Sequence, residues 1–121
     1  MAHAYELVTV TIPTGAPGLS AAFNVPAGKV PLAIYMPATW VAADISFQAG
    51  PKRDAAWQNL FGEDDAEVVI QAAQARYIGI TKAVAARFEG IASMKVRSGT
   101  AATPVDQTAS RVLLFVFGRL G

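Results

Sequence analysis

The chain is built from short runs of alternating apolar and polar residues, each ended by glycine or proline. In the first run, 6–12, Val8, Val10 and Ile12 occupy one face, and Pro13 follows directly. A period of two residues is typical of β-strands, and no long stretch keeps the 3.6-residue period of an amphipathic helix. The pattern therefore predicts an all-β protein.

The same reading along the chain predicts about nine short strands. They cover residues 6–12, 20–25, 30–36, 45–48, 57–61, 67–71, 76–81, 91–97 and 111–117. Pro31 indicates that its strand begins at a sheet edge, because proline cannot donate to a ladder. The segment 112–117 is apolar on both faces, which favours a central strand buried on both sides. Residues 66–88 also permit a helix, but their β-branched residues favour two strands and one helical turn over 83–88.

With 121 residues, the chain has room for one domain. We expect a single domain over residues 1–121, with the fold of a jelly-roll-like β-sandwich of about eight to nine short antiparallel strands. Hydrophobic residues make up 53% of the chain and charged residues only 16%. Two interpretations remain open: an alanine-rich core, or apolar surface that neighbouring subunits cover.

Charge and cysteine content exclude several classes of function. The formal net charge is +1 and the basic residues are dispersed, whereas nucleic-acid binders carry dense basic patches. The chain has no cysteine, which excludes thiol chemistry and cysteine-ligated zinc. Neither a transmembrane span nor a signal peptide is evident, so we expect synthesis in the cytoplasm, no membrane insertion, and exit only as part of a larger particle.

No catalytic constellation is recognisable. The only histidine is His3, at the start of the chain, so the usual triads cannot be built. Nucleotide-binding, metalloprotease and nucleophile-elbow motifs are missing from the sequence. We expect a protein that is not an enzyme and uses no cofactor.

Acidic residues cluster at Glu63, Asp64 and Asp65, with Glu67 close behind. A solvated turn between strands is the interpretation that we favour. A Ca²⁺ site competes with it, because hard cations bind several carboxylate oxygens from one loop, although the spacing matches no established loop. A pair of carboxylates for glycoside hydrolysis is the third interpretation.

A few aromatic and basic residues are candidates for ligand binding. The aromatic residues that could stack on a sugar ring are Trp40, Trp57, Tyr35 and Tyr77. Trp40, in the loop 36–43, is the strongest of these candidates, although packing in the core is the interpretation that we favour for it. Arg76, Lys95 and Arg97 fall on predicted strands. We favour a structural role for their charges, either protecting strand edges or pairing with Asp44 and Glu67. The alternative is that they bind an acidic glycan or a carboxylate of a neighbouring subunit.

Five segments carry a resemblance to a known group of proteins. In order they read MPxxW within 31–40, FQ within 44–48, RYI within 75–80, KVRSGT within 91–100, and PVxQ at 104–107. The order resembles small proteins encoded in the structural-gene regions of tailed phages and prophages, over roughly 31–114. Phage-derived transfer particles carry the same pattern.

The resemblance implies a virion component with a jelly-roll or discoidin-like β-sandwich, such as a capsid decoration, head fibre, spike or tail-associated adhesion module. It brings no catalytic or ligand residues with it. We therefore expect a non-catalytic structural protein, a capsid decoration or the base of a head fibre or spike, located in the virion as a homo-oligomer that contacts other virion proteins. The alternative is a carbohydrate-binding module for attachment to a host surface glycan. The segment 98–107 is expected to be a protruding loop.

Overall fold

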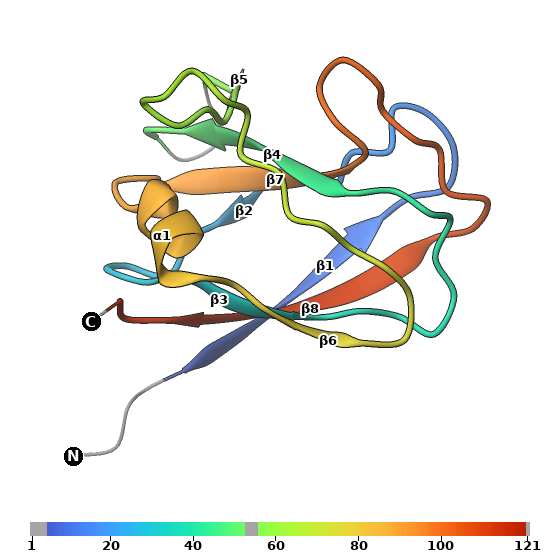
Figure 1. Cartoon of the computed structure of the whole chain (residues 1–121), viewed down its shortest axis with the longest axis horizontal. Coiled ribbons are helices and arrows are strands. Elements are labelled where there is room, and N and C mark those ends of the chain that lie inside the picture. The colour runs from blue at the N-terminus through green and yellow to red at the C-terminus, as the bar shows by residue number, and fades with distance from the viewer. Residues whose placement is uncertain (1–4, 53–55, 121) are drawn as a thin grey trace.

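The computed structural model describes residues 5–52 and 56–120. This part of the chain forms eight strands and one short helical segment (Figure 1). The strands are β1 (Glu6–Ile12), β2 (Phe23–Asn24), β3 (Val30–Tyr35), β4 (Ile45–Gly50), β5 (Gln58–Asn59), β6 (Tyr77–Gly79), β7 (Ser93–Ser98) and β8 (Arg111–Gly118). The predicted all-β class is confirmed.

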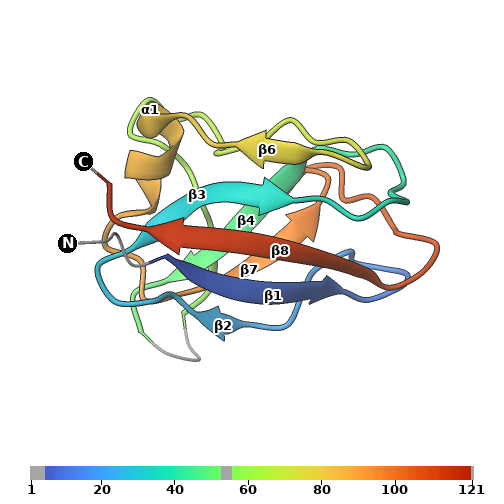
Figure 2. The same ribbon diagram turned by 90° about the horizontal axis from the view of Figure 1, so that it is seen from below.

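The strands form two four-stranded antiparallel sheets that pack face to face as a sandwich. One sheet, here called the β8 sheet, has the order β1-β8-β3-β6, and the other, the β7 sheet, has the order β2-β7-β4-β5. Figures 1 and 2 show the two sheets as separate layers. Each sheet alternates strands from the two halves of the chain, which is the strand order of a jelly roll. The predicted jelly-roll-like sandwich is confirmed.

The core lies between the sheets and is rich in phenylalanine. Phe115 of β8 packs edge-to-face on Phe47 of β4, with ring centroids 6.4 Å apart. Phe88 packs on the same Phe47 ring at 4.9 Å. All three rings are buried, so together they join the two sheets to the helical segment. Edge-to-face pairs of this kind add about 0.5–1.5 kcal/mol each beyond the area that they bury.

The helical segment closes one end of the sandwich (Figure 1). It consists of α1 (Lys82–Ala85) and a 3₁₀ turn (Ala86–Phe88). Thr81 caps it, because its side-chain oxygen accepts a hydrogen bond from the Val84 N–H at 3.3 Å. The predicted helical turn over 83–88 is confirmed. Within the described residues, no helix has the length and apolar character to cross a membrane.

The structure differs from the sequence predictions in some details. Residues 67–71 form no strand; Glu67 and Ile70 make only isolated bridges, to Phe61 and Ile45. The sheet edge predicted at Pro31 holds only for the start of β3, because β6 pairs with Ala33–Tyr35 and leaves Pro31 paired with β8 alone, whereas the rest of β3 lies between two strands. The pairing register of β3 with β8 shifts between Pro31 and Ala33, so the proline sits at a bulge, where its missing N–H is tolerated.

The run 112–117 is a central strand, as predicted, but it is not buried on both sides. β8 lies between β1 and β3, and Leu113, Phe115 and Phe117 point into the core. The alternate residues point outward, and Val112 among them is 53% exposed. An apolar strand in the middle of the β8 sheet thus presents one apolar side to solvent.

Candidate functional site

The outward side chains of the β8 sheet form a continuous uncharged surface, here called the apolar face. Strand pairing places them in rows: Leu7 beside Val116 and Ala33, and Thr9 beside Leu114, Tyr35 and Tyr77, with Tyr5, Thr11 and Val112 completing the surface. None of these residues carries a charge. Figure 2 shows the four strands from this side, with no helix in front of them.

The apolar face gathers most of the exposed large hydrophobic side chains of the described chain. Five of the six lie on it: Tyr5 (60% exposed), Leu7 (63%), Tyr35 (56%), Tyr77 (62%) and Val112 (53%). Together they present about 500 Å² of surface, given that a whole aromatic side chain offers about 150–250 Å². A patch of about 500 Å² lies within the range of the largest apolar patch on a monomeric protein, and such patches are often functional.

Charged residues lie at the ends of the strands that carry the apolar face. Glu6 and Arg111 lie at opposite ends of the β1–β8 pair, where they flank the strands. Arg76 directly precedes β6, and Arg119 directly follows β8. An apolar centre within a polar rim is the usual anatomy of a protein–protein interface.

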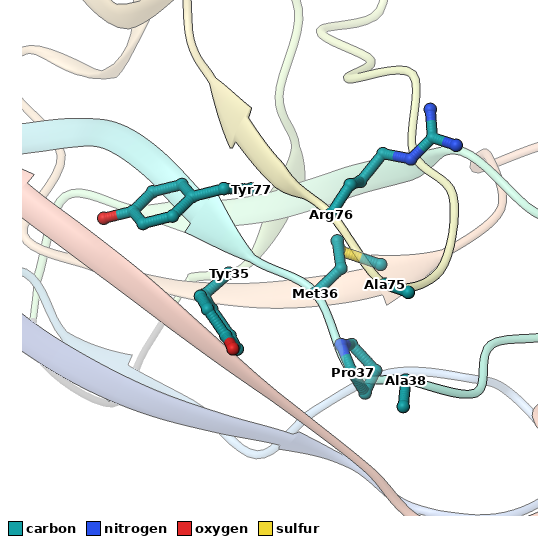
Figure 3. A pocket seen from close by; sticks show the side chains of 7 residues that line it. All are labelled: Tyr35, Met36, Pro37, Ala38, Ala75, Arg76 and Tyr77. Atoms are coloured by element: carbon teal, nitrogen blue, oxygen red, sulfur yellow. The ribbon is translucent and has the colours of Figure 1, made fainter.

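A shallow depression lies at the β6 end of the apolar face (Figure 3). It has a volume of about 560 Å³, and it is lined by residues of two segments, 35–38 and 75–77. Tyr35 and Tyr77 meet edge-to-face there, with ring centroids 5.6 Å apart. Figure 3 shows the Arg76 side chain extending away from both rings. The depression therefore offers two exposed aromatic rings with a cation at its margin.

The outer side of the β7 sheet is different, because it carries polar and charged groups that are already paired. The guanidinium of Arg97 donates to Asn59 Oδ1 at 2.6 and 3.2 Å, and Glu67 Oε2 lies 3.8 Å from it. Burial lowers the pKa of Arg97, and the charge of Glu67 opposes that shift. Lys95 lies over the Trp57 ring, 4.8 Å from its centroid. These contacts give Lys95 and Arg97 structural partners within the molecule.

Trp40 packs in the core. It is 5% exposed, and its indole N–H donates to the Ala43 carbonyl at 3.0 Å. The exposure that a sugar-stacking ring needs is found instead at Tyr35 and Tyr77. The sequence names both tyrosines as candidates but does not place them together, because they lie far apart in sequence and meet only through the pairing of β3 with β6.

The acidic cluster forms an exposed turn. Asp64 accepts the Ala66 N–H at 3.2 Å and pairs with Arg87 at 3.1 Å. These hydrogen bonds, the backbone one first, lower the pKa of Asp64. Glu63 and Asp65 are also exposed. Within residues 5–52 and 56–120, no three potential ligands among His, Asp and Glu gather closely enough to hold a metal ion. His3 lies outside the described residues.

Comparison with known proteins gives no assignment. No protein-family model matches the chain, and neither a curated protein nor a solved structure is significantly similar to it. The apolar face therefore carries the functional interpretation.

Proposed function

We propose that this chain is a non-catalytic structural protein of a phage or phage-like particle, a capsid decoration or the base of a head fibre or spike. It docks on the protein shell of that particle through the apolar face. The observation that carries the proposal is the concentration of five of the six exposed large hydrophobic side chains on one uncharged side of the sandwich. The sequence resemblance supplies the kind of particle.

Energetics supports docking through this face. Burying about 500 Å² of apolar area at about 25 cal/mol per Å² yields about 12 kcal/mol before costs. Association costs about 4–15 kcal/mol in lost freedom, which is of the same size as this gain, so one copy alone is expected to bind weakly and several copies together more firmly. Tyrosines suit such a role, because each offers a large rigid contact area and a hydroxyl that can hydrogen-bond at the rim.

The experiment first identifies the genes that neighbour this chain's gene and, where these include a major capsid protein, measures binding to shells assembled from that protein. Tyr35→Lys and Val112→Lys place a charge on the apolar face, and each is expected to weaken co-sedimentation by about tenfold or more, since a buried unpaired charge costs well over 1.4 kcal/mol. Gln58→Lys is the matched control, because it adds the same charge at an exposed position of the β7 sheet. Equal binding of all variants removes the apolar face as the docking surface. A wild-type chain that does not bind shells overturns the proposed function.

A carbohydrate-binding role is the second candidate, and the depression at Tyr35 and Tyr77 favours it. Aromatic rings stack on the apolar faces of sugars, and Arg76 can bind a carboxylate at the margin. A glycan array with the wild-type chain tests this role. Tyr77→Ala and Arg76→Ala are expected to abolish any hit, while Gln74→Ala, at a nearby exposed position, retains it. An array without a hit, or a hit that Tyr77→Ala leaves unchanged, contradicts this site.

A further inference from the structure

The four edge strands of the two sheets differ in length. Three end in strands of only two or three residues: β2, β5 and β6. Very short edge strands are a common protection against unwanted pairing. The fourth edge is β1, which has seven residues and is paired on one side only, with β8. β1 is therefore the one long edge among the described strands.

The free edge of β1 also lacks the other usual protections. Between Glu6 and Ile12 there is no lysine, no proline and no bulge in the pairing with β8. The single charge, on Glu6, is paired with Lys29 at 2.8 Å. Apart from the ladder with β8, no backbone hydrogen bond joins β1 to the rest of the described chain. In an edge strand, alternate residues turn their N–H and C=O groups away from the sheet, so β1 presents a row of unused donors and acceptors.

We propose that a second copy of this chain occupies this edge. The two β1 strands pair antiparallel around a twofold axis at Thr9, which joins the two β8 sheets into one continuous eight-stranded sheet. The pairing uses the strand edge and leaves the apolar face uncovered. It therefore goes beyond the proposed docking on a shell and is tested separately from it.

The sequence of β1 suits pairing with itself. Thr9 is the middle residue of Glu6–Ile12, so an axis at Thr9 is the one register that pairs all seven residues. In this register Thr9 faces its own copy, Val8 faces Val10, and the only charged residue, Glu6, faces Ile12. Threonine pairs and pairs of β-branched residues are favourable across strands, and no like charges oppose each other. A strand with several charges would not tolerate this symmetry.

Area also favours a second copy over an unrelated peptide. The apolar face of one copy presents about 500 Å², which is less than the roughly 800 Å² that each partner contributes to a standard protein interface. Edge-to-edge pairing places two such faces side by side in one sheet and doubles the area that can dock on a shell. A peptide added to the edge brings no second apolar face.

A cysteine cross-link tests the register directly, because the chain has no cysteine of its own. Thr9 is exposed, so Thr9→Cys is expected to leave the fold intact. In the proposed dimer the two introduced cysteines at position 9 face each other at a Cα separation that disulfides accept. We expect mild oxidation to convert most of the Thr9→Cys protein into a covalent dimer on a non-reducing gel.

Thr11→Cys is the matched control, since it lies on the same side of the same strand. In the proposed register Thr11 faces Leu7 of the other copy, and the two introduced cysteines at position 11 are about 13 Å apart, too far for a disulfide. Thr11→Cys alone is expected to remain monomeric on the gel, and the double variant Leu7→Cys with Thr11→Cys to cross-link. Equal cross-linking of Thr9→Cys and Thr11→Cys indicates random collision and overturns the register.

Light scattering of the wild-type chain provides the second measurement. We expect the mass of a dimer that dissociates on dilution, and a monomer for Thr9→Lys, in which like charges oppose each other across the axis. A wild-type chain that is monomeric at every concentration, with no cross-link in the Thr9→Cys variant, overturns the dimer. The proposed shell docking still stands in that case if Tyr35→Lys and Val112→Lys lose shell binding.

Discussion

The side-chain amide of Gln107 hydrogen-bonds the backbone of Val41 in both directions. The Val41 N–H donates to Oε1 at 2.9 Å, and Nε2 donates to the Val41 carbonyl at 3.1 Å. Gln107 is 1% exposed, and its own carbonyl accepts from Gly15 N–H at 3.0 Å. One residue thus joins three loops, 13–22, 36–44 and 99–110, at the end of the sandwich opposite α1 (Figure 1).

Replacing Gln107 is expected to loosen this end of the molecule. Gln107→Leu preserves the volume but leaves the Val41 N–H and carbonyl without partners in a partly buried place. We expect the free energy of unfolding to fall by about 2–3 kcal/mol, measured by chemical denaturation. Gln74→Leu, at an exposed position, is the control and is expected to change stability by less than about 0.5 kcal/mol. Equal stability of the two variants contradicts the joining role of Gln107.

The buried Arg97 depends on two partners, so its neighbours are expected to act non-additively. Glu67→Gln removes the charge that faces the guanidinium and is expected to cost about 1–2 kcal/mol, because a buried charge loses its counter-ion. Arg97→Met is expected to cost a similar amount, since Asn59 loses its donor. The double variant is expected to lose less than the sum. A double-mutant cycle, measured by chemical denaturation, gives the coupling free energy between Glu67 and Arg97. Strict additivity of the two losses means that their interaction contributes nothing to stability.

The strands that alternate most regularly could be predicted best from the sequence. The predicted run 6–12 coincides with β1, and 111–117 falls within β8, because a run of seven alternating or continuous apolar residues favours a strand strongly. The run 67–71 is equally apolar but forms only two bridges. Its Val68 and Ile70 fill the core from an irregular segment, and burial alone does not require a ladder.

The apolar face itself could not be predicted, because an apolar strand in a covered sheet and one in an uncovered sheet have the same sequence. Val112, Leu114 and Val116 read as buried, and only the structure shows that nothing in the described chain covers them. Gln107 was expected in a protruding loop, yet it is buried, since its role depends on the Val41 backbone 66 residues away.

Acid is expected to weaken the turn at Asp64 selectively. Hydrogen bonds from Ala66 N–H and Arg87 hold the pKa of Asp64 below its usual value in the folded protein. The stability from this carboxylate is therefore complete above the unfolded-state pKa of about 4, and it is lost as the pH falls through the lower folded-state pKa. We expect wild type to lose more stability than Asp64→Asn between neutral pH and about pH 3. Denaturation curves at several pH values measure the difference, and parallel pH profiles exclude it.

Two glycines with the same backbone conformation are expected to respond differently to a methyl group. Gly15 and Gly99 have φ values of +87° and +93°, which strain any other residue. A Cβ at Gly15 meets nothing within 4 Å, whereas one at Gly99 collides with the Thr103 carbonyl and lies 2.7 Å from Val105 N. The two positions thus separate backbone strain from steric overlap.

We expect Gly15→Ala to lower the free energy of unfolding by about 1 kcal/mol, from strain alone. Gly99→Ala adds the displacement of backbone atoms in the turn 99–104 and is expected to cost about 3 kcal/mol in total. Both variants keep the apolar face and β1 unchanged, so thermal denaturation reports the turn and nothing else. Equal losses of unfolding free energy in the two variants mean that the turn 99–104 rearranges to accommodate the methyl group. In that case the close approach of Thr103 and Val105 to Gly99 does not hold the loop in place.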